Sequence, residues 1–190
     1  MKRFGTAGRS SKTLLWTSMA AATALGISAC TTSEVERGYK IPEALCDTPV
    51  SPRLLETVLP AAGEKISMTP KNDVSGIKRC RVMVDGKLAL SASTEWWGKE
   101  TTLLKVASTM RGVKLDDRVT EDRRFAYAEK GAVGRVECPN PTVASRKTEG
   151  ALYATIWITD EGTPNESAMK DLITAYTAAV TASVECAGSE

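Results

Sequence analysis

The sequence predicts an α+β fold in which an antiparallel sheet packs with about three helices, in the order α-β-β-α-β-β-β-α. Several segments alternate apolar and polar side chains with a period of two, which is typical of half-buried strands. Short connections such as Asp85-Gly86 join neighbouring segments, and such hairpins impose antiparallel pairing. Apolar side chains recur at helical spacing in the segment after Pro164, so a long helix can cover one face of the sheet.

The first helix and the first hairpin lie between residues 51 and 97. Ser51 is a suitable N-cap and Pro52 suits the first helical position, while Pro60 should end the regular helix. The strands CRVMV (80–84) and KLALSASTEW (87–96) flank Asp85-Gly86, a pair that tolerates positive φ at both positions. The core-facing side chains of the second strand are expected to be Leu88, Leu90, Ala92, Thr94 and Trp96.

Two further helices and three strands are expected in the second half of the chain. A helix is expected over 99–111, then a charged stretch, then two strands around Lys130-Gly131 and a third strand over 151–160. The last helix should begin at the capping box that starts with Thr163 and has Pro164 at the first helical position. Its apolar stripe is Met169, Leu172, Ile173, Tyr176, Val180 and Val184.

The first thirty residues are typical of an exported lipoprotein. Four basic side chains precede an apolar run over 14–27 that is too short to span a bilayer comfortably. The run leads into Ile27-Ser28-Ala29-Cys30, which resembles a bacterial lipobox. The resemblance implies that residues 1–29 are a signal peptide and that Cys30 is acylated. The alternatives are an ordinary signal peptide or a cytosolic helix with an incidental cysteine.

We therefore expect three parts: the signal peptide 1–29, the lipidated cysteine with a flexible tether over 30–45, and a single α+β domain over 46–190. The chain would be exported by the general secretory route and held by its lipid on the outer face of the cytoplasmic membrane. Residues 1–29 hold four of the 25 basic side chains and none of the 23 acidic ones, so the remaining chain has a formal net charge of −2. No nucleic-acid partner is expected, since that would require a basic excess.

Four cysteines remain besides Cys30, and an even number in an exported chain predicts two disulfides. Three connectivities are possible. We favour Cys46–Cys80 with Cys138–Cys186, because each bond then closes a loop within one half of the chain. No metal or cofactor is expected, because the sequence has no histidine and no closely spaced cysteine pair.

The segment LCDTPVSPRLLETVLP, the strand opening CRV and the cysteine in a late alanine-rich helix resemble small actinobacterial cell-surface lipoproteins of unassigned function. Some of these lipoproteins are similar to the Mog1/PsbP-like α/β/α fold. The resemblance implies an accessory or binding role at the cell envelope and supplies no catalytic motif.

Catalysis is not expected, because histidine is absent and no nucleophile or phosphate-loop motif is present. Asp116, Asp117, Glu121 and Asp122 could form the carboxylate pair of a cell-wall hydrolase, but three arginines among them favour a solvated charged run. A structural lipoprotein without a defined ligand is a further alternative.

Binding is the function that the sequence favours, through aromatic side chains. Trp96 and Trp97 should point to opposite faces of a strand, so that Trp97 could stack on a sugar or anchor a protein. Trp157 and Tyr153 share a strand face and could extend this patch, unless a helix covers them. The expected partners are the membrane, through the lipid on Cys30, and an envelope protein or cell-wall glycan.

Overall fold

The computed structural model describes residues 37–72, 76–110, 114, 118–138 and 150–187. The chain divides into two compact units, Met1–Ser33 and Glu34–Glu190, and every described residue belongs to the second unit. Cys30 and the predicted signal peptide, residues 1–29, lie outside the described residues. Within the described part, no helix is both long enough and apolar enough to cross a bilayer.

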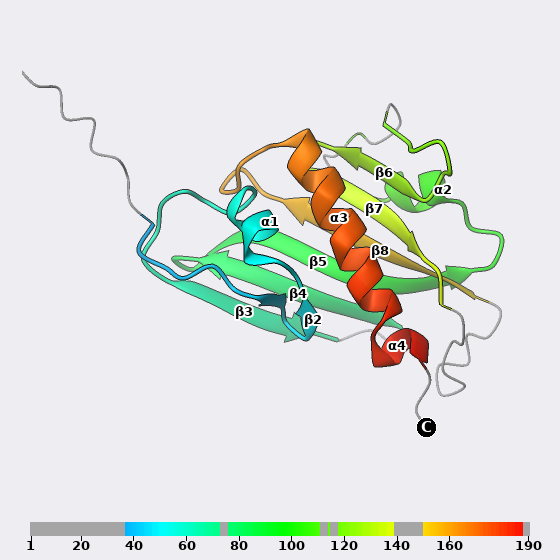
Figure 1. Ribbon diagram of the computed structural model, residues 1–190, viewed down its shortest axis with the longest axis horizontal. Coiled ribbons are helices and arrows are strands. Elements are labelled where there is room, and N and C mark those ends of the chain that lie inside the picture. The colour runs from blue at the N-terminus through cyan, green and yellow to red at the C-terminus, as the bar shows by residue number, and fades with distance from the viewer. Residues whose placement is uncertain (1–36, 73–75, 111–113, 115–117, 139–149, 188–190) are drawn as a thin grey trace, which may run out of the picture. The chain divides into compact units, whose positions relative to one another are not determined.

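Six strands form one sheet in the order β3-β4-β5-β8-β7-β6, and every neighbouring pair is antiparallel (Figure 1). The predicted α+β class with an antiparallel sheet is therefore confirmed. The sheet strands are β3 (Ile66–Lys71), β4 (Ile77–Val84), β5 (Lys87–Gly98), β6 (Phe125–Ala128), β7 (Gly131–Val136) and β8 (Gly150–Ile158). The other elements are β1 (Ala44–Leu45), β2 (Thr48–Pro49), α1 (Pro52–Glu56), α2 (Leu103–Ala107), α3 (Glu166–Thr181) and α4 (Val184–Ala187).

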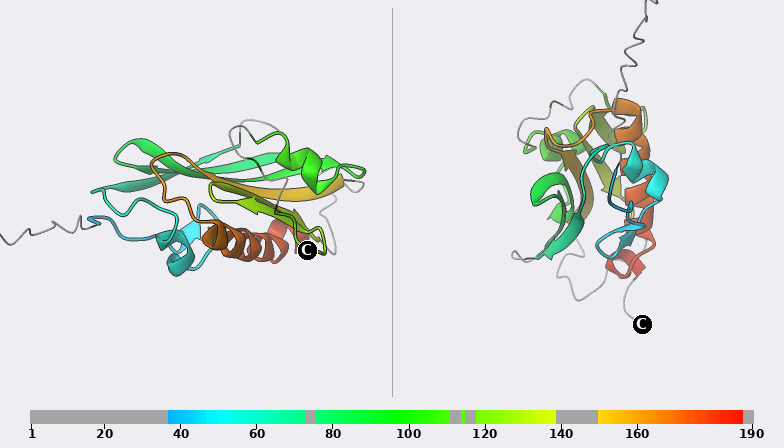
Figure 2. Two further views of the ribbon diagram at one scale, coloured as in Figure 1. Left: turned by 90° about the horizontal axis from the view of Figure 1, so that it is seen from above. Right: turned by 90° about the vertical axis from the view of Figure 1, so that its left-hand side faces the viewer.

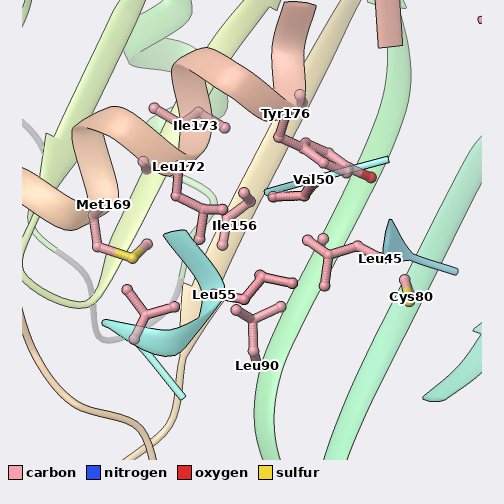
Figure 3. Packing of buried hydrophobic residues seen from close by; sticks show 14 of the residues in the cluster. Leu45, Val50, Leu55, Cys80, Leu90, Ile156, Met169, Leu172, Ile173 and Tyr176 are labelled. Carbon is pink, nitrogen blue, oxygen red and sulfur yellow. The ribbon is translucent and has the colours of Figure 1, made fainter. Parts of the chain in front are cut away.

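The two faces of the sheet are covered unequally. The helices α1 and α3 and the β1–β2 ribbon lie on one face, here called the inner face, whereas α2 lies on the other, the outer face (Figure 2). Leu90, Ile156 and Leu172 are fully buried between the sheet and the inner layer (Figure 3). A smaller apolar cluster under α2 covers the outer face of β6, β7 and β8. Most of the apolar surface is thus buried on the inner side.

The helix α3 approaches β7 closely at Gly134. A Cβ atom at this position would overlap with Thr177 Oγ1 and would lie 3.1 Å from Cδ1 of Phe125. Asn165 caps this helix, since its side chain accepts a hydrogen bond of 2.9 Å from the backbone N–H of Ala168. The cap predicted at Thr163 is therefore wrong by two residues.

The helix count and lengths differ from the prediction. The element expected over 99–111 is the five-residue α2, which begins after the N-cap Thr102. The regular part of the first helix is also only five residues long. The last helix ends at Thr181, so Val184 falls in the separate helix α4 and is 74 % exposed, outside the predicted apolar stripe.

The hairpin between β4 and β5 forms around Asp85 and Gly86, whose φ values are 49° and 78°. A bulge follows it, because Val82 pairs with Leu90 while Met83 pairs with Leu88, which leaves Ala89 as the extra residue. Leu88 is consequently on the same face as Met83 and only half-buried, whereas the sequence pattern placed it in the core.

The tether predicted over 30–45 does not reach residue 45. Tyr39 and Leu45 are buried in the main core, and the Tyr39 hydroxyl donates a hydrogen bond of 2.5 Å to the carbonyl of Pro60. Arg37 also donates to the carbonyls of Glu56, the last residue of α1, and of Pro60. The buried side chains of Tyr39 and Leu45, and the hydrogen bonds of Arg37 and Tyr39 to backbone carbonyls, make the chain part of the domain from residue 37 onward.

Two disulfides join the layers, Cys46–Cys80 and Cys138–Cys186, the pairing that loop closure favoured. The first ties the turn between β1 and β2 to β4, and the second ties α4 to the end of β7. The Cα atoms of the pairs are 5.8 and 4.7 Å apart, respectively.

The sheet ends in two unlike edges. The edge strand β3, which the sequence analysis missed, contains Pro70, which has no backbone N–H, and ends at Lys71. The other edge strand, β6, is flanked by an added segment: Val119 bridges Ala126, and the N–H of Tyr127 donates to the carbonyl of Arg118 at 3.0 Å.

Candidate binding site on the outer face of the sheet

A hollow of about 570 Å³ lies on the outer face where β3, β4, β5 and β8 are not covered by α2. We call it the outer trough. Its floor is formed by hydroxyl side chains of β5 and β8, one bank by the guanidinium groups of β4, and the other bank by the C-terminal end of α2 and a tryptophan of β8. The lining includes Arg79, Arg81, Ser91, Ser93, Thr155 and Trp157.

The bulge in β5 determines which side chains of β4 and β5 lie next to each other in the trough. Arg81 pairs across the strands with Ser91, which pairs in turn with Trp157. An uninterrupted hairpin would pair Arg81 with Leu90, a core residue. The extra residue Ala89 shifts the pairing by one, so that the basic and hydroxyl side chains share a face. Two strand spacings separate Arg81 from Trp157, or about 10 Å between their backbones.

The next set of paired residues across the three strands also begins with an arginine and a serine. Arg79 pairs with Ser93, and Ser93 pairs with Thr155. The hydroxyls of Ser93 and Thr155 are 2.7 Å apart and hydrogen-bonded to each other. A hydroxyl can both donate and accept, so this pair retains capacity for a further partner. The floor is polar at these hydroxyls, whereas Leu88, Val106 and Met110 add apolar surface to the lining of the trough.

The electrostatic character of the trough comes from β4. Arg79 is exposed and Arg81 is half-buried, and neither forms a salt bridge within the ranges that the structure describes. Lys71 of the edge strand also lines the trough, as does the carboxylate of Glu95. The two arginines outnumber the carboxylate in the lining, so the β4 bank is positive, although the chain from Cys30 onward is slightly acidic.

The three aromatic residues predicted to bind are in different environments. Trp157 is half-buried and lines the trough. Tyr153 is only 1 % exposed under α2 and donates a hydrogen bond of 2.5 Å to the carbonyl of Thr101. This burial raises the pKa of the Tyr153 phenol. Trp97 packs against the same outer cluster, and its indole N–H is buried. Only Trp157 is therefore placed to meet a ligand in the trough.

The neighbouring Trp96 supports the structure on the opposite face. It packs against the inner core, and its indole N–H donates a hydrogen bond of 2.9 Å to Oε1 of Glu185. Glu185 also forms a salt bridge with Lys78. These contacts hold α4 against β4 and β5. Lys78 and Glu185 also line a second hollow, of about 320 Å³, beside the Cys46–Cys80 disulfide, together with Asp47 and Arg79.

The structure describes two of the four carboxylates predicted as a possible catalytic cluster. Asp116 and Asp117 lie outside the described residues, and Glu121 is exposed. Asp122 accepts a hydrogen bond of 2.5 Å from the Thr120 hydroxyl and another of 3.1 Å from the N–H of Arg124. These hydrogen bonds, that from Thr120 first, lower the pKa of Asp122. Both hydrogen bonds are made within the turn over 120–124, so Asp122 serves as a turn residue in this structure.

Sequence reasoning missed Arg79 and Arg81. A signal was present, because the two arginines flank Cys80, the first residue of the strand predicted over 80–84, at a spacing of two. Their relation to Trp157 depends on the register of three strands and on the bulge. Comparison of the chain with family models, with curated proteins and with solved structures finds no match.

Proposed function

We propose that this chain is a lipid-anchored lipoprotein of the outer face of the cytoplasmic membrane that binds another component of the cell envelope, a protein or a glycan, and is not an enzyme. The resemblance of its first thirty residues to a lipobox supports the anchor on Cys30. The similarity to small actinobacterial surface lipoproteins supports the setting. The outer trough is the proposed binding surface.

The observation that carries the binding role is the placement of Arg79 and Arg81 opposite Trp157 across neighbouring strands of the sheet. Guanidinium groups without a carboxylate partner in the described chain, beside a half-exposed indole, are the groups that recur at binding surfaces. The two disulfides support an oxidising location, in which such bonds persist.

The anchor predicts a defined N-terminus. Protein isolated from the native host should begin at Cys30 and carry added acyl mass in intact mass spectrometry, because the lipobox directs cleavage before the modified cysteine. The Cys30→Ala variant should lack the acyl mass. A wild-type protein that begins at Met1 without acyl mass would refute the anchor.

The binding role predicts position-specific crosslinking in intact cells. A photoreactive amino acid at Thr109, an exposed position on the bank of the trough, should give a higher-mass product after irradiation. The same amino acid at Thr174, exposed on α3 on the other side of the sheet, is the matched control and should give none. A product of equal yield at both positions, or at neither, would contradict binding through the trough.

A further inference from the structure

We infer that the ligand of the outer trough is an anionic glycan, a polymer of sugar rings that carry carboxylate or phosphate groups. The inference rests on the proposed function, because it names the ligand class for the same surface. It is drawn from the charge of the trough, the chemistry of its floor and the position of its one tryptophan.

The charge of the trough selects for an anion. Arg79 and Arg81 alternate with the buried Cys80, so both point to the outer face. The two arginines outnumber the carboxylate of Glu95 in the lining. Guanidinium groups bind carboxylate and phosphate with two parallel hydrogen bonds, so either anion fits this bank.

The hydroxyl groups of the floor and the indole on the opposite bank favour a ligand that contains sugar rings. Ser93 and Thr155 present hydroxyls that can donate to and accept from the hydroxyls of a saccharide. Trp157 offers the apolar body of an indole at the side of this floor, and an aromatic face can pack on the flat apolar face of a sugar ring. A polar floor flanked by one aromatic ring and one cationic row matches the two surfaces of an acidic sugar.

A protein or a lipid surface fits the trough less well. Protein interfaces are rich in aromatic side chains and poor in serine at their centres, and they bury about 1,200 Å² or more. The trough has serine at its centre. A lipid surface is bound by apolar side chains that protrude into the headgroups, but Trp157 is half-buried in a concave site.

The test measures the affinity of the full-length protein, purified in detergent micelles, for defined polysaccharides. The probes are polygalacturonate, which carries a carboxylate on its rings, phosphomannan, which carries phosphate, and neutral dextran. We expect binding to at least one charged polymer, weakened by added salt, and none to dextran. Failure with both charged polymers would overturn the inference.

Paired variants assign the binding to the trough. Arg79→Gln/Arg81→Gln should weaken binding about tenfold or more, since charge-assisted hydrogen bonds are lost. The control Arg53→Gln/Lys65→Gln removes the same charge from exposed positions that do not line the trough and should change the affinity by less than about twofold. Equal weakening by both pairs would overturn the inference in favour of unspecific attraction.

The aromatic contribution is separated from charge by Trp157→Ala, which should weaken binding to the charged polymer about tenfold while the salt dependence stays the same. Thermal unfolding of each variant shows whether the domain remains folded. If Trp157→Ala alters the fold, the arginine pair and its control still decide the outcome.

Two further probes distinguish the other occupants. Polyglutamate carries carboxylates without sugar rings, and equal or tighter binding to it would identify an acidic protein segment instead. Binding to vesicles with anionic lipids that is lost in the arginine variant would identify a lipid surface. A crosslink at Thr109 that persists when no polysaccharide binds would leave the envelope-binding role intact and reject only the glycan.

Discussion

Replacing Cys46 and Cys80 together by alanine is expected to lower the free energy of unfolding by about 4 kcal/mol, because the bond closes a loop with a sequence separation of 34 residues. The bond restricts the unfolded chain, and its loss returns that conformational freedom. A domain of this size is stabilised by about 5–15 kcal/mol, so the change is a large part of the total.

Urea unfolding of the full-length protein under oxidising conditions measures this effect. The variant Cys138→Ala/Cys186→Ala is the comparison, since its bond closes a separation of 48 residues and should contribute a similar amount. Either variant unfolding at the urea concentration of the wild type would show that the corresponding bond does not stabilise the domain.

Leu172→Ala is expected to destabilise the domain by about 3–4 kcal/mol, since the side chain is fully buried and its removal leaves a cavity. Leu172 projects from α3 toward the sheet and is enclosed with Met169, Ile173 and Ile156 (Figure 3). This is the layer contact between the only long helix of the described chain and the sheet.

The matched control is Thr174→Ala on the exposed side of the same helix, with an expected change within about 0.5 kcal/mol. Both variants should keep the wild-type dependence of stability on urea concentration, because the unfolding transition exposes nearly the same surface. A loss below about 1 kcal/mol for Leu172→Ala would mean that α3 does not pack on the sheet as described.

Strands with one buried face were predictable from the sequence, because alternation reports burial directly. The sequences of β5 and β8 alternate over most of their length, although residues 151–154 of β8 are buried on both faces, and Asp85-Gly86 marks the hairpin. By contrast, β3 was missed because five of its six residues are exposed and it contains Pro70, so it has no apolar period. The short helices were overestimated, since apolar spacing indicates a face but not the residue at which hydrogen bonding ends.

The binding surface was predictable only in part. The sequence indicated Trp157 but could not show that α2 covers Tyr153, because coverage of a strand face depends on tertiary packing. The position of Arg81 opposite Ser91 depends on the bulge at Ala89, and a one-residue shift in register moves a whole strand to the other face. The arginines of β4 and the tryptophan of β8 are therefore brought together by the fold, and no local sequence motif indicates that they are neighbours.

The two edges of the sheet have a consequence for a protein held at a membrane. Anchored molecules diffuse in two dimensions and collide with similar orientations, which favours strand-to-strand polymerisation if an edge is open. Pro70 interrupts the donor row on one border, and the segment around Val119 occupies the other. If the proposed lipid anchor concentrates the domain on a membrane, these two edges oppose its growth into a continuous intermolecular sheet.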